Sequence, residues 1–272
     1  MPIVAYRLIV LGLTTLAVVA PLSLVIYQSF LTAPFFDPSA KAGFLAYTFV
    51  LADSDFWQAF WTTIAIAAGM AIIAVPLGAL LAFLMVRTDV PGRQWLEPLI
   101  LVPIFVSAVV IAFGYVVAIG PVGIFSTLAK DLLGFVPWNL YSLFALIVIA
   151  GLTHVPHVYL YSAAALRGLG TDLEEAARVS GANPFRVAIN VSLPMILPAI
   201  LFAGVLVFFL GFELFGLPLV LGDPQDVLVL STYLYKLTNK LGVPSYQLMA
   251  VVVVAIIAVT ATIATTTTAI SS

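Results

Sequence analysis

The chain has 272 residues, of which 63% are hydrophobic and only 8% are charged. Soluble domains carry about a quarter charged residues, so this composition excludes a water-soluble globular protein. Ten Lys and Arg against twelve Asp and Glu give a formal net charge of −2, which provides no basic field for a nucleic acid. There is no cysteine, which excludes disulfide frameworks, thiolate catalysis and cysteine-based metal sites. Lipid is the environment that explains the apolar content.

Six apolar stretches of the sequence are long enough to cross the hydrocarbon core of a bilayer, which takes about 20 helical residues. They comprise residues 8–30, 56–86, 99–119, 140–166, 193–220 and 246–270. Nearly all the charge lies between them. We therefore expect an all-α membrane protein with six transmembrane helices. The first stretch is long and lacks a clear small-residue cleavage site after Pro21, so we interpret it as a retained helix and not as a signal peptide.

Lysine and arginine positions predict the orientation of the chain, because inner loops carry the excess of both. If the N-terminus is cytoplasmic, the inner residues comprise Arg7, Arg87, Arg93, Arg167, Arg178 and Arg186, and the outer ones Lys41, Lys130, Lys236 and Lys240. This modest bias is sharpened where Arg87 and Arg93 bracket a short loop. Both termini are therefore expected in the cytoplasm.

Two outer segments carry polar residues beside aromatic ones. The first, residues 32–55, contains Asp37, Asp53 and Asp55. The second, residues 222–245, favours a short amphipathic helix that holds Tyr233, Tyr235, Lys236 and Lys240. Such segments usually lie in the membrane interface, and the alternative is a docking role.

The connection of residues 167–194 is the most informative part of the chain. Thr171 or Asp172 is placed to cap a short helix whose first turn is acidic. Gly181 suits a left-handed stop at the end of that helix, and Pro184 suits the first turn of the next one. The pattern predicts two short helices that are joined by a tight turn and lead into the fifth span.

One motif in this connection resembles a known family. Glu175-Ala176-Ala177, followed by Gly181 and then by Val191-x-Leu193-Pro194, is similar to the EAA loop of the membrane subunits of type I ABC importers. Segments elsewhere look like the iron(III)-type branch of these permeases, and they are Arg87-Thr-Asp-Val-Pro-Gly-Arg93, Leu96-Glu97-Pro98, Gly120-Pro-Val-Gly123, Phe212-Glu213, Leu221-Gly222-Asp223-Pro224 and Leu230-Ser-Thr-Tyr233. In that branch one polypeptide often carries two six-helix halves, and this chain resembles the first half.

The resemblance implies a type I ABC importer permease fold, with residues 1–55 as a first helix and outer loop. Residues 56–270 would form the permease domain, with its cytoplasmic EAA coupling loop at about 167–194. That loop would insert into a groove of an ATPase subunit through Glu175, Ala176, Ala177, Gly181, Phe185 and Arg186. Glu175 has an alternative role as an acid favoured by the helix dipole, and Arg186 as a solvated inner charge.

The resemblance also implies the partners. The chain has no glycine-rich phosphate loop, so it would bind no cofactor itself, and a cytoplasmic ATPase dimer would bind ATP and Mg²⁺. A second permease half and a substrate-binding protein complete the importer in the inner membrane of a bacterium or archaeon. Iron(III) is the preferred substrate, and polyamine, thiamine and phosphonate permeases share parts of the pattern. We expect no catalytic residue and no resident metal site.

Three polar residues lie inside apolar stretches. Glu213 is placed where a charge is costly, so it indicates either the substrate path or a position close enough to the interface to be hydrated. His154 and His157 are three residues apart and share a helix face. They either contact substrate or form interhelical hydrogen bonds, since two histidines alone make a poor metal site.

Two other classes of protein compete with the importer. A secondary transporter or channel would show inverted repeats, broken helices with convergent polar groups, or a proton relay. An intramembrane enzyme would need a nucleophile with a base or a metal cluster, and neither a Gly-x-Ser-x-Gly nor a His-Glu-x-x-His motif is present. The EAA-like loop would have no role in either class.

Overall fold

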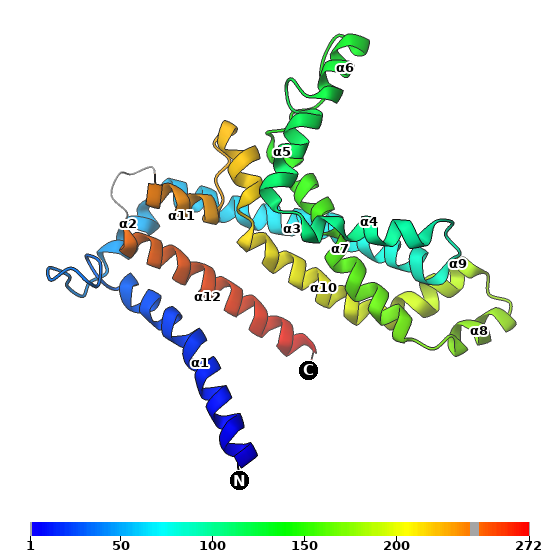
Figure 1. Cartoon of the computed structure of the whole chain (residues 1–272), viewed down its shortest axis with the longest axis horizontal. Coiled ribbons are helices and arrows are strands. Elements are labelled where there is room, and N and C mark those ends of the chain that lie inside the picture. The colour runs from blue at the N-terminus through cyan, green and yellow to red at the C-terminus, as the bar shows by residue number, and fades with distance from the viewer. Residues whose placement is uncertain (1, 240–244, 272) are drawn as a thin grey trace. The chain divides into compact units, whose positions relative to one another are not determined.

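The computed structural model describes residues 2–239 and 245–271, and its regular structure there is helical apart from one isolated bridge between Leu31 and Ala42 (Figure 1). Within these ranges, six stretches are long and apolar enough to cross a membrane. They are Tyr6–Ser29, Ser54–Arg87, Ala108–Leu133, Leu143–Gly168, Pro184–Glu213 and Tyr246–Ile263. The expected all-α fold with six candidate spans is confirmed. Lys240 lies outside the described residues.

The helices gather into two compact units, which we describe separately. The terminal unit comprises Met1–Phe60 and Leu230–Ser272, and the central unit comprises Trp61–Val229. The long helix α3 (Ser54–Arg87) begins in the first and continues in the second. The division of the sequence at residue 55 stays a prediction.

In the terminal unit, α12 (Tyr246–Ser271) packs against α1 (Pro2–Ser29), α2 (Leu45–Ala52) and α11 (Leu230–Asn239). Helix α11 confirms the predicted amphipathic helix, because Tyr233 and Leu237 are buried while Tyr235 is exposed. Helix α2 was not expected from the sequence. Two polar contacts bind α11 to the junction between α2 and α3: the Tyr233 hydroxyl donates to Asp53 at 2.7 Å, and Lys236 pairs with Asp55.

The core of the central unit lies where α7 (Leu143–Gly168) packs against α10 (Leu193–Glu213) and against the second part of α3. At Gly78 of α3, an added Cβ would lie 2.6 Å from the Val158 Cβ and 2.9 Å from the Val155 carbonyl oxygen. Only glycine permits this approach. Small residues at such crossings are typical of membrane helices, where packing rather than burial from water drives association.

The third expected span, 99–119, is wrong as a single helix. It divides into α4 (Arg93–Phe105) and α5 (Ala108–Ile119), with extended backbone at Val106 between them. Pro98 and Pro103 lie inside α4, and each lacks the N–H that a helix needs for its ladder. The candidate span in this region, Ala108–Leu133, starts later and continues into α6 (Ile124–Leu133).

The fifth expected span, 193–220, is also wrong at its end. Helix α10 stops at Glu213, Leu214 is extended, and a separate π-helical turn, η2 (Pro218–Gly222), leads into the 3₁₀ turn η3 (Asp223–Gln225). The break in this span meets the break in the third, because a Cβ on Gly216 would lie 3.0 Å from the Val109 nitrogen. At its start, the fifth span is extended by α9 (Pro184–Val187) and η1 (Ala188–Ser192).

Candidate functional site

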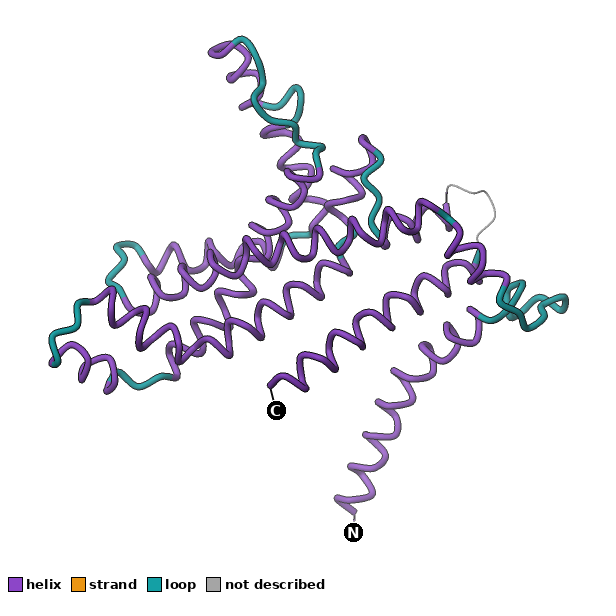
Figure 2. The backbone as a smooth tube through the Cα atoms, turned by 180° about the vertical axis from the view of Figure 1, so that it is seen from behind, coloured by secondary structure: helices purple, strands orange, loops and turns teal. Residues whose placement is uncertain are grey.

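The candidate site is the predicted coupling loop, residues 167–194, with helix α8 (Asp172–Val179) at its centre. It lies at the same end of the central unit as the short turn between α3 and α4 (Figures 1 and 2). We call this the coupling-loop end. Two connections that the sequence analysis assigned to one side of the membrane are thus neighbours in space.

The predicted turn between the two short helices is confirmed. Gly181 has a φ of +87°, which L side chains rarely adopt, and nothing lies within 4 Å of the position that a Cβ would occupy. Its N–H donates to the Arg178 carbonyl, and the Ala182 N–H donates to the Ala177 carbonyl, which is the glycine-dependent way to end a helix. The Asn183 side chain caps α9, and Pro184 opens that helix as predicted.

The capping expected of Thr171 takes a different form. Thr171 occupies the N-cap position of α8, but its side chain accepts no backbone bond there. Its hydroxyl instead donates to the Glu175 carboxylate at 2.9 Å. Thr171 therefore holds the side chain of Glu175, the first residue of the EAA-like motif, within the loop.

The residues predicted to dock an ATPase are mostly on the surface of the loop. Glu175, Ala176, Gly181, Phe185 and Arg186 are exposed, and Ala177 is half-buried. Phe185 is 71% exposed. Two further apolar side chains of the loop, Leu173 and Val179, are exposed beside them, Val179 by 90%, and the sequence reasoning did not single these out. Apolar side chains at this exposure indicate a surface that a partner covers.

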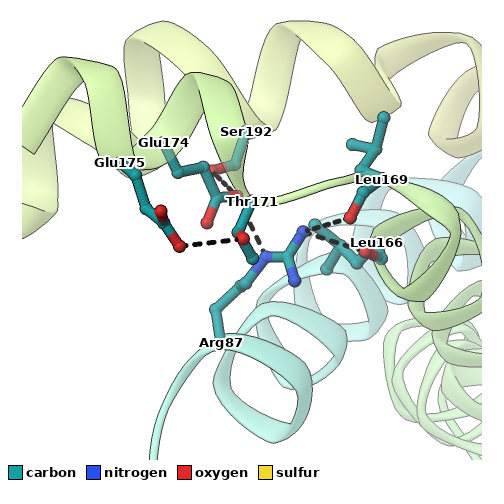
Figure 3. Close-up of polar contacts among 7 residues, drawn as sticks. All are labelled: Arg87, Leu166, Leu169, Thr171, Glu174, Glu175 and Ser192. Atoms are coloured by element: carbon teal, nitrogen blue, oxygen red, sulfur yellow. Dashed lines mark hydrogen bonds and ion pairs between the residues drawn. The ribbon is translucent and has the colours of Figure 1, made fainter.

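Glu174 behaves differently from its neighbour Glu175. It is only 4% exposed and is the one buried residue of α8. Its Oε1 accepts from Arg87 Nε at 2.9 Å and from the Ser192 hydroxyl at 2.7 Å (Figure 3). A buried carboxylate requires such partners, because an unpaired charge away from water is far more costly than a paired one.

Arg87 completes this buried cluster. It is the last residue of α3, and its Nη2 donates to the carbonyls of Leu166 and Leu169 at 2.9 and 3.3 Å. These carbonyls lie at the end of α7, where the last carbonyl groups of a helix have no hydrogen-bond donor within the helix. Because one guanidinium carries several donors in a fixed fork, it binds the carboxylate and both carbonyls together.

A second polar cluster lies nearby in the central unit. Glu97 of α4 accepts from the Tyr159 hydroxyl at 2.9 Å, pairs with Arg167 of α7, and lies 3.9 Å from Arg93. The Arg167 hydrogen bond is the main cause that lowers the pKa of Glu97 below its usual value. The carboxylate therefore stays charged and ties α4 to α7.

The predicted substrate-path residues are placed as follows. Glu213 is exposed and ends α10, beside the break in the fifth span, rather than lying inside a continuous helix. His154 and His157 share a face of α7 as expected, with stacked rings whose centroids are 5.3 Å apart. His154 Nδ1 lies 2.7 Å from the Ala150 carbonyl, so it bonds within its own helix. No group of three metal-ligating side chains occurs in the described ranges.

Arg87, Glu174 and Ser192 are the residues of this site that sequence reasoning missed. Arg87 was interpreted as an inner charge, and Glu174 lies in the helix turn that was predicted only to be acidic. Both interpretations are compatible with exposure. The sequence did contain one signal for this site: an acid, Glu174, lies in one predicted inner loop and a base, Arg87, in another. Which acid contacts which base could be decided only from the packing of α3 against α7.

Comparisons with known proteins agree with this geometry. Residues 74–270 match the model of the family described as "Binding-protein-dependent transport system inner membrane component". The chain is 31% identical over 252 residues to the probable ABC transporter permease protein y4oQ of Sinorhizobium fredii, covering 86% of this chain and 77% of that protein. It is 27% identical over 195 residues to the molybdenum transport system permease protein ModB of Escherichia coli K12, covering 71% and 84%.

A solved structure supports the fold. A chain of a bacterial ABC transporter involved in the import of the acidic polysaccharide alginate superposes with a TM-score of 0.81 at 20% identity, covering 98% of this chain and 94% of that one. The family match covers well over half of the sequence, and six candidate spans accompany it. The chain therefore belongs to the family of binding-protein-dependent transport system inner membrane components and is a multi-pass permease of an ABC importer.

Proposed function

We propose that this permease forms one half of the translocation pathway of its importer and is driven by an ATPase that docks on the coupling loop. The supporting observation is the exposed face of α8 and α9. Leu173, Val179 and Phe185 are apolar and uncovered there, while Ala176 and Gly181 allow another backbone to approach closely.

The energy source in this proposal is a cytoplasmic ATPase dimer that binds ATP and Mg²⁺. Closure of the dimer would draw two coupling loops together, one from this chain and one from a second permease half. A conformational change of this kind follows only if the ATPase binds the two arrangements with different affinity. Both termini would face the cytoplasm, as the distribution of arginine predicts.

The substrate path in this proposal passes the place where the third and fifth spans break. Non-helical backbone at membrane depth is tolerated only in a protein interior or along a water-filled cavity. Ser107 and Glu213 are exposed beside these breaks, so a hydrated path suits both residues. His154 and His157 are secondary candidates, because the Nδ1 of His157 is buried without a hydrogen-bond partner in the described chain.

The cargo would be delivered by a binding protein outside the cell. The relatives above are named for molybdenum transport and for import of alginate, so they do not identify one cargo. Iron(III), which the sequence resemblance favours, stays a prediction, and the carboxylate of Glu213 beside the break in the fifth span would suit a cation. Polyamine, thiamine and phosphonate are the alternatives within the same importer type.

Copurification from mild detergent tests the docking proposal. Wild-type protein is compared with Gly181→Arg, which places a large side chain at a left-handed position of the docking face. The control is Gly134→Arg at the end of α6, where φ is +81° and the space is equally open. We expect an ATPase subunit, identified by mass, with wild type and the control, but not with Gly181→Arg.

The same eluate also tests the two-half arrangement, which a second permease chain in it would support. If a folded wild-type protein brings down no ATPase, the docking proposal fails. Uptake of labelled ferric ion, molybdate or spermidine into cells that express the complete importer then tests the cargo.

A further inference from the structure

We propose that Arg87, Glu174 and Ser192 form the mechanical link that transmits displacement of α8 to the membrane helices. This inference rests on the proposed function, in which an ATPase docks on α8. It assigns transmission to Glu174, the neighbour of the first EAA-like residue, and leaves Glu175 on the docking surface. These three side chains, hereafter the coupling clamp, are shown in Figure 3.

Burial identifies the attachment point of α8. Its residues from Asp172 to Val179 are exposed or half-buried except for Glu174. Besides the chain at its two ends, where α8 lies against α9 and η1, Glu174 is therefore the main side-chain attachment of this helix. One end of α8 leads into the turn at Gly181, and at the other end a short non-helical connection begins with extended backbone at Leu169.

The clamp joins the ends of four helical segments. The guanidinium belongs to the last residue of α3 and reaches two carbonyls at the end of α7. The carboxylate belongs to α8, and the hydroxyl belongs to η1, which continues into α10. Because one carboxylate oxygen accepts from both Arg87 and Ser192, displacement of α8 acts on α3 and α10 together.

The chemistry of the clamp suits transmission of movement. Its charged side chains are 12% and 6% exposed, so water cannot readily replace the contact as it would at an open surface. Separating a buried pair leaves two uncompensated charges, whereas an apolar contact could slide without such a penalty. The π-helical start of α10 beside Ser192 is a second unusual feature at this point, because π turns are rare and often occur at functional sites.

Glu175 provides the matched comparison. It is adjacent in sequence and identical in chemistry, but it is exposed, and its carboxylate accepts a hydrogen bond from Thr171 within the same loop. Removing its charge alters the docking face and leaves the clamp intact. Removing the charge of Glu174 alters the clamp and leaves the docking face intact.

The test uses the whole importer, purified with its ATPase and placed in lipid nanodiscs. The chain contains no cysteine, so spin labels can be attached at two introduced ones, Asp172→Cys at the start of α8 and Trp95→Cys on α4. Asp172 is exposed and lies outside the docking face, and Trp95 is 76% exposed. The label separation is measured without nucleotide and with ATP plus vanadate, in the wild-type background and in Glu174→Gln, Ser192→Ala and Glu175→Gln.

We expect one narrow distribution of distances in wild type and in Glu175→Gln, unchanged by nucleotide, because α8 and the membrane helices move together. In Glu174→Gln the distribution should broaden, and its mean should shift by several Å when ATP and vanadate are added, while ATP hydrolysis continues. Ser192→Ala should show the same change to a smaller extent. A role in stability alone would reduce the yield of assembled complex and leave the distances in assembled complexes narrow.

Unchanged distances in an assembled Glu174→Gln complex would overturn the proposal. If that variant does not assemble, Ser192→Ala decides, and a wild-type distribution in it also overturns the proposal. Failure of the docking hypothesis is distinguishable, because wild-type protein would then bind no ATPase at all.

Discussion

The central and terminal units each use a charged side-chain pair to tie helices together, but the two pairs differ in burial. Arg87 and Glu174, at the coupling-loop end of the central unit, are 12% and 6% exposed. Lys236 and Asp55 in the terminal unit are 35% and 37% exposed. A buried pair is costly to open, whereas an exposed pair is screened by salt and easily replaced by water.

This contrast indicates which part of the protein must keep its internal geometry. The loop that would receive force from an ATPase is attached by a cluster that resists separation. Helix α11 is attached to the region around Asp53 and Asp55 by contacts that permit adjustment, and these include the hydrogen bond from the buried Tyr233 to Asp53.

The largest expected effect comes from breaking the buried pair. Arg87→Met would leave Glu174 charged and unpaired and would remove the donor to the Leu166 and Leu169 carbonyls. We expect the free energy of unfolding to fall by about 3–5 kcal/mol, the range for removal of one partner of a buried pair. Thermal unfolding in detergent measures it.

Arg93→Met is the control for this prediction. Arg93 is 42% exposed and lies 3.9 Å from Glu97, so its removal should cost well under about 1 kcal/mol. If both variants lost the same free energy of unfolding, burial would not explain the stabilising effect of the Arg87–Glu174 pair.

The second effect concerns the buried hydroxyl of the terminal unit. Burial, followed by the hydrogen bond to Asp53, raises the pKa of Tyr233, so the hydroxyl keeps its proton and donates. Tyr233→Phe should lower the free energy of unfolding by about 1.5 kcal/mol, at the low end for a bond to a charged group, since Asp53 can rehydrate. The control Tyr246→Phe retains its ring contact with Phe36 and should change little.

The third effect depends on pH. Because the Glu97 pKa is lowered in the folded protein, its contribution is present above the usual glutamate pKa of about 4.3 and is lost as pH falls through the lowered value. Glu97→Gln should therefore be less stable than wild type at pH 7, by about 1 kcal/mol. The difference should disappear in more acidic buffer, and a pH-independent difference would count against the assignment to Arg167.

The smallest effect is expected at the exposed pair. Lys236→Met should cost at most about 0.5 kcal/mol in dilute buffer and nothing measurable at about 1 M salt, where screening acts over about 3 Å. Lys130→Met on α6 serves as an exposed lysine control that should show no salt dependence. If Lys236→Met still lowered the free energy of unfolding in high salt, the Lys236–Asp55 pair would behave as a buried pair, and the contrast with Arg87 and Glu174 would fail.

Local chemistry predicted much of this protein. Apolar runs of sufficient length predicted the number of candidate spans, though not the bounds of the third and fifth, since the bilayer imposes a minimum helix length. Gly181, Asn183 and Pro184 have conformational preferences that act within a few residues, so the turn in the coupling loop was predictable as well. The family followed from the same loop, because its motif is a local pattern of small and acidic residues.

Helix breaks were less predictable from sequence. The run 99–119 is uniformly apolar, and Pro98 and Pro103 are compatible with a kinked but continuous helix. The place where the chain becomes extended, at Val106, depends on how α5 packs against Gly216 and η2. The same applies to the end of α10 at Glu213.

The sequence by itself determined that the chain spans a membrane with helices and carries a small-residue loop with a glycine turn, because hydropathy, capping and turn preferences are local. Only the tertiary structure decided that Glu174, and not Glu175, joins Arg87 and Ser192. The three residues are 87 and 18 positions apart, so their contact depends on how α3, α7 and α10 converge, and burial then makes an ordinary surface acid the anchor of the loop.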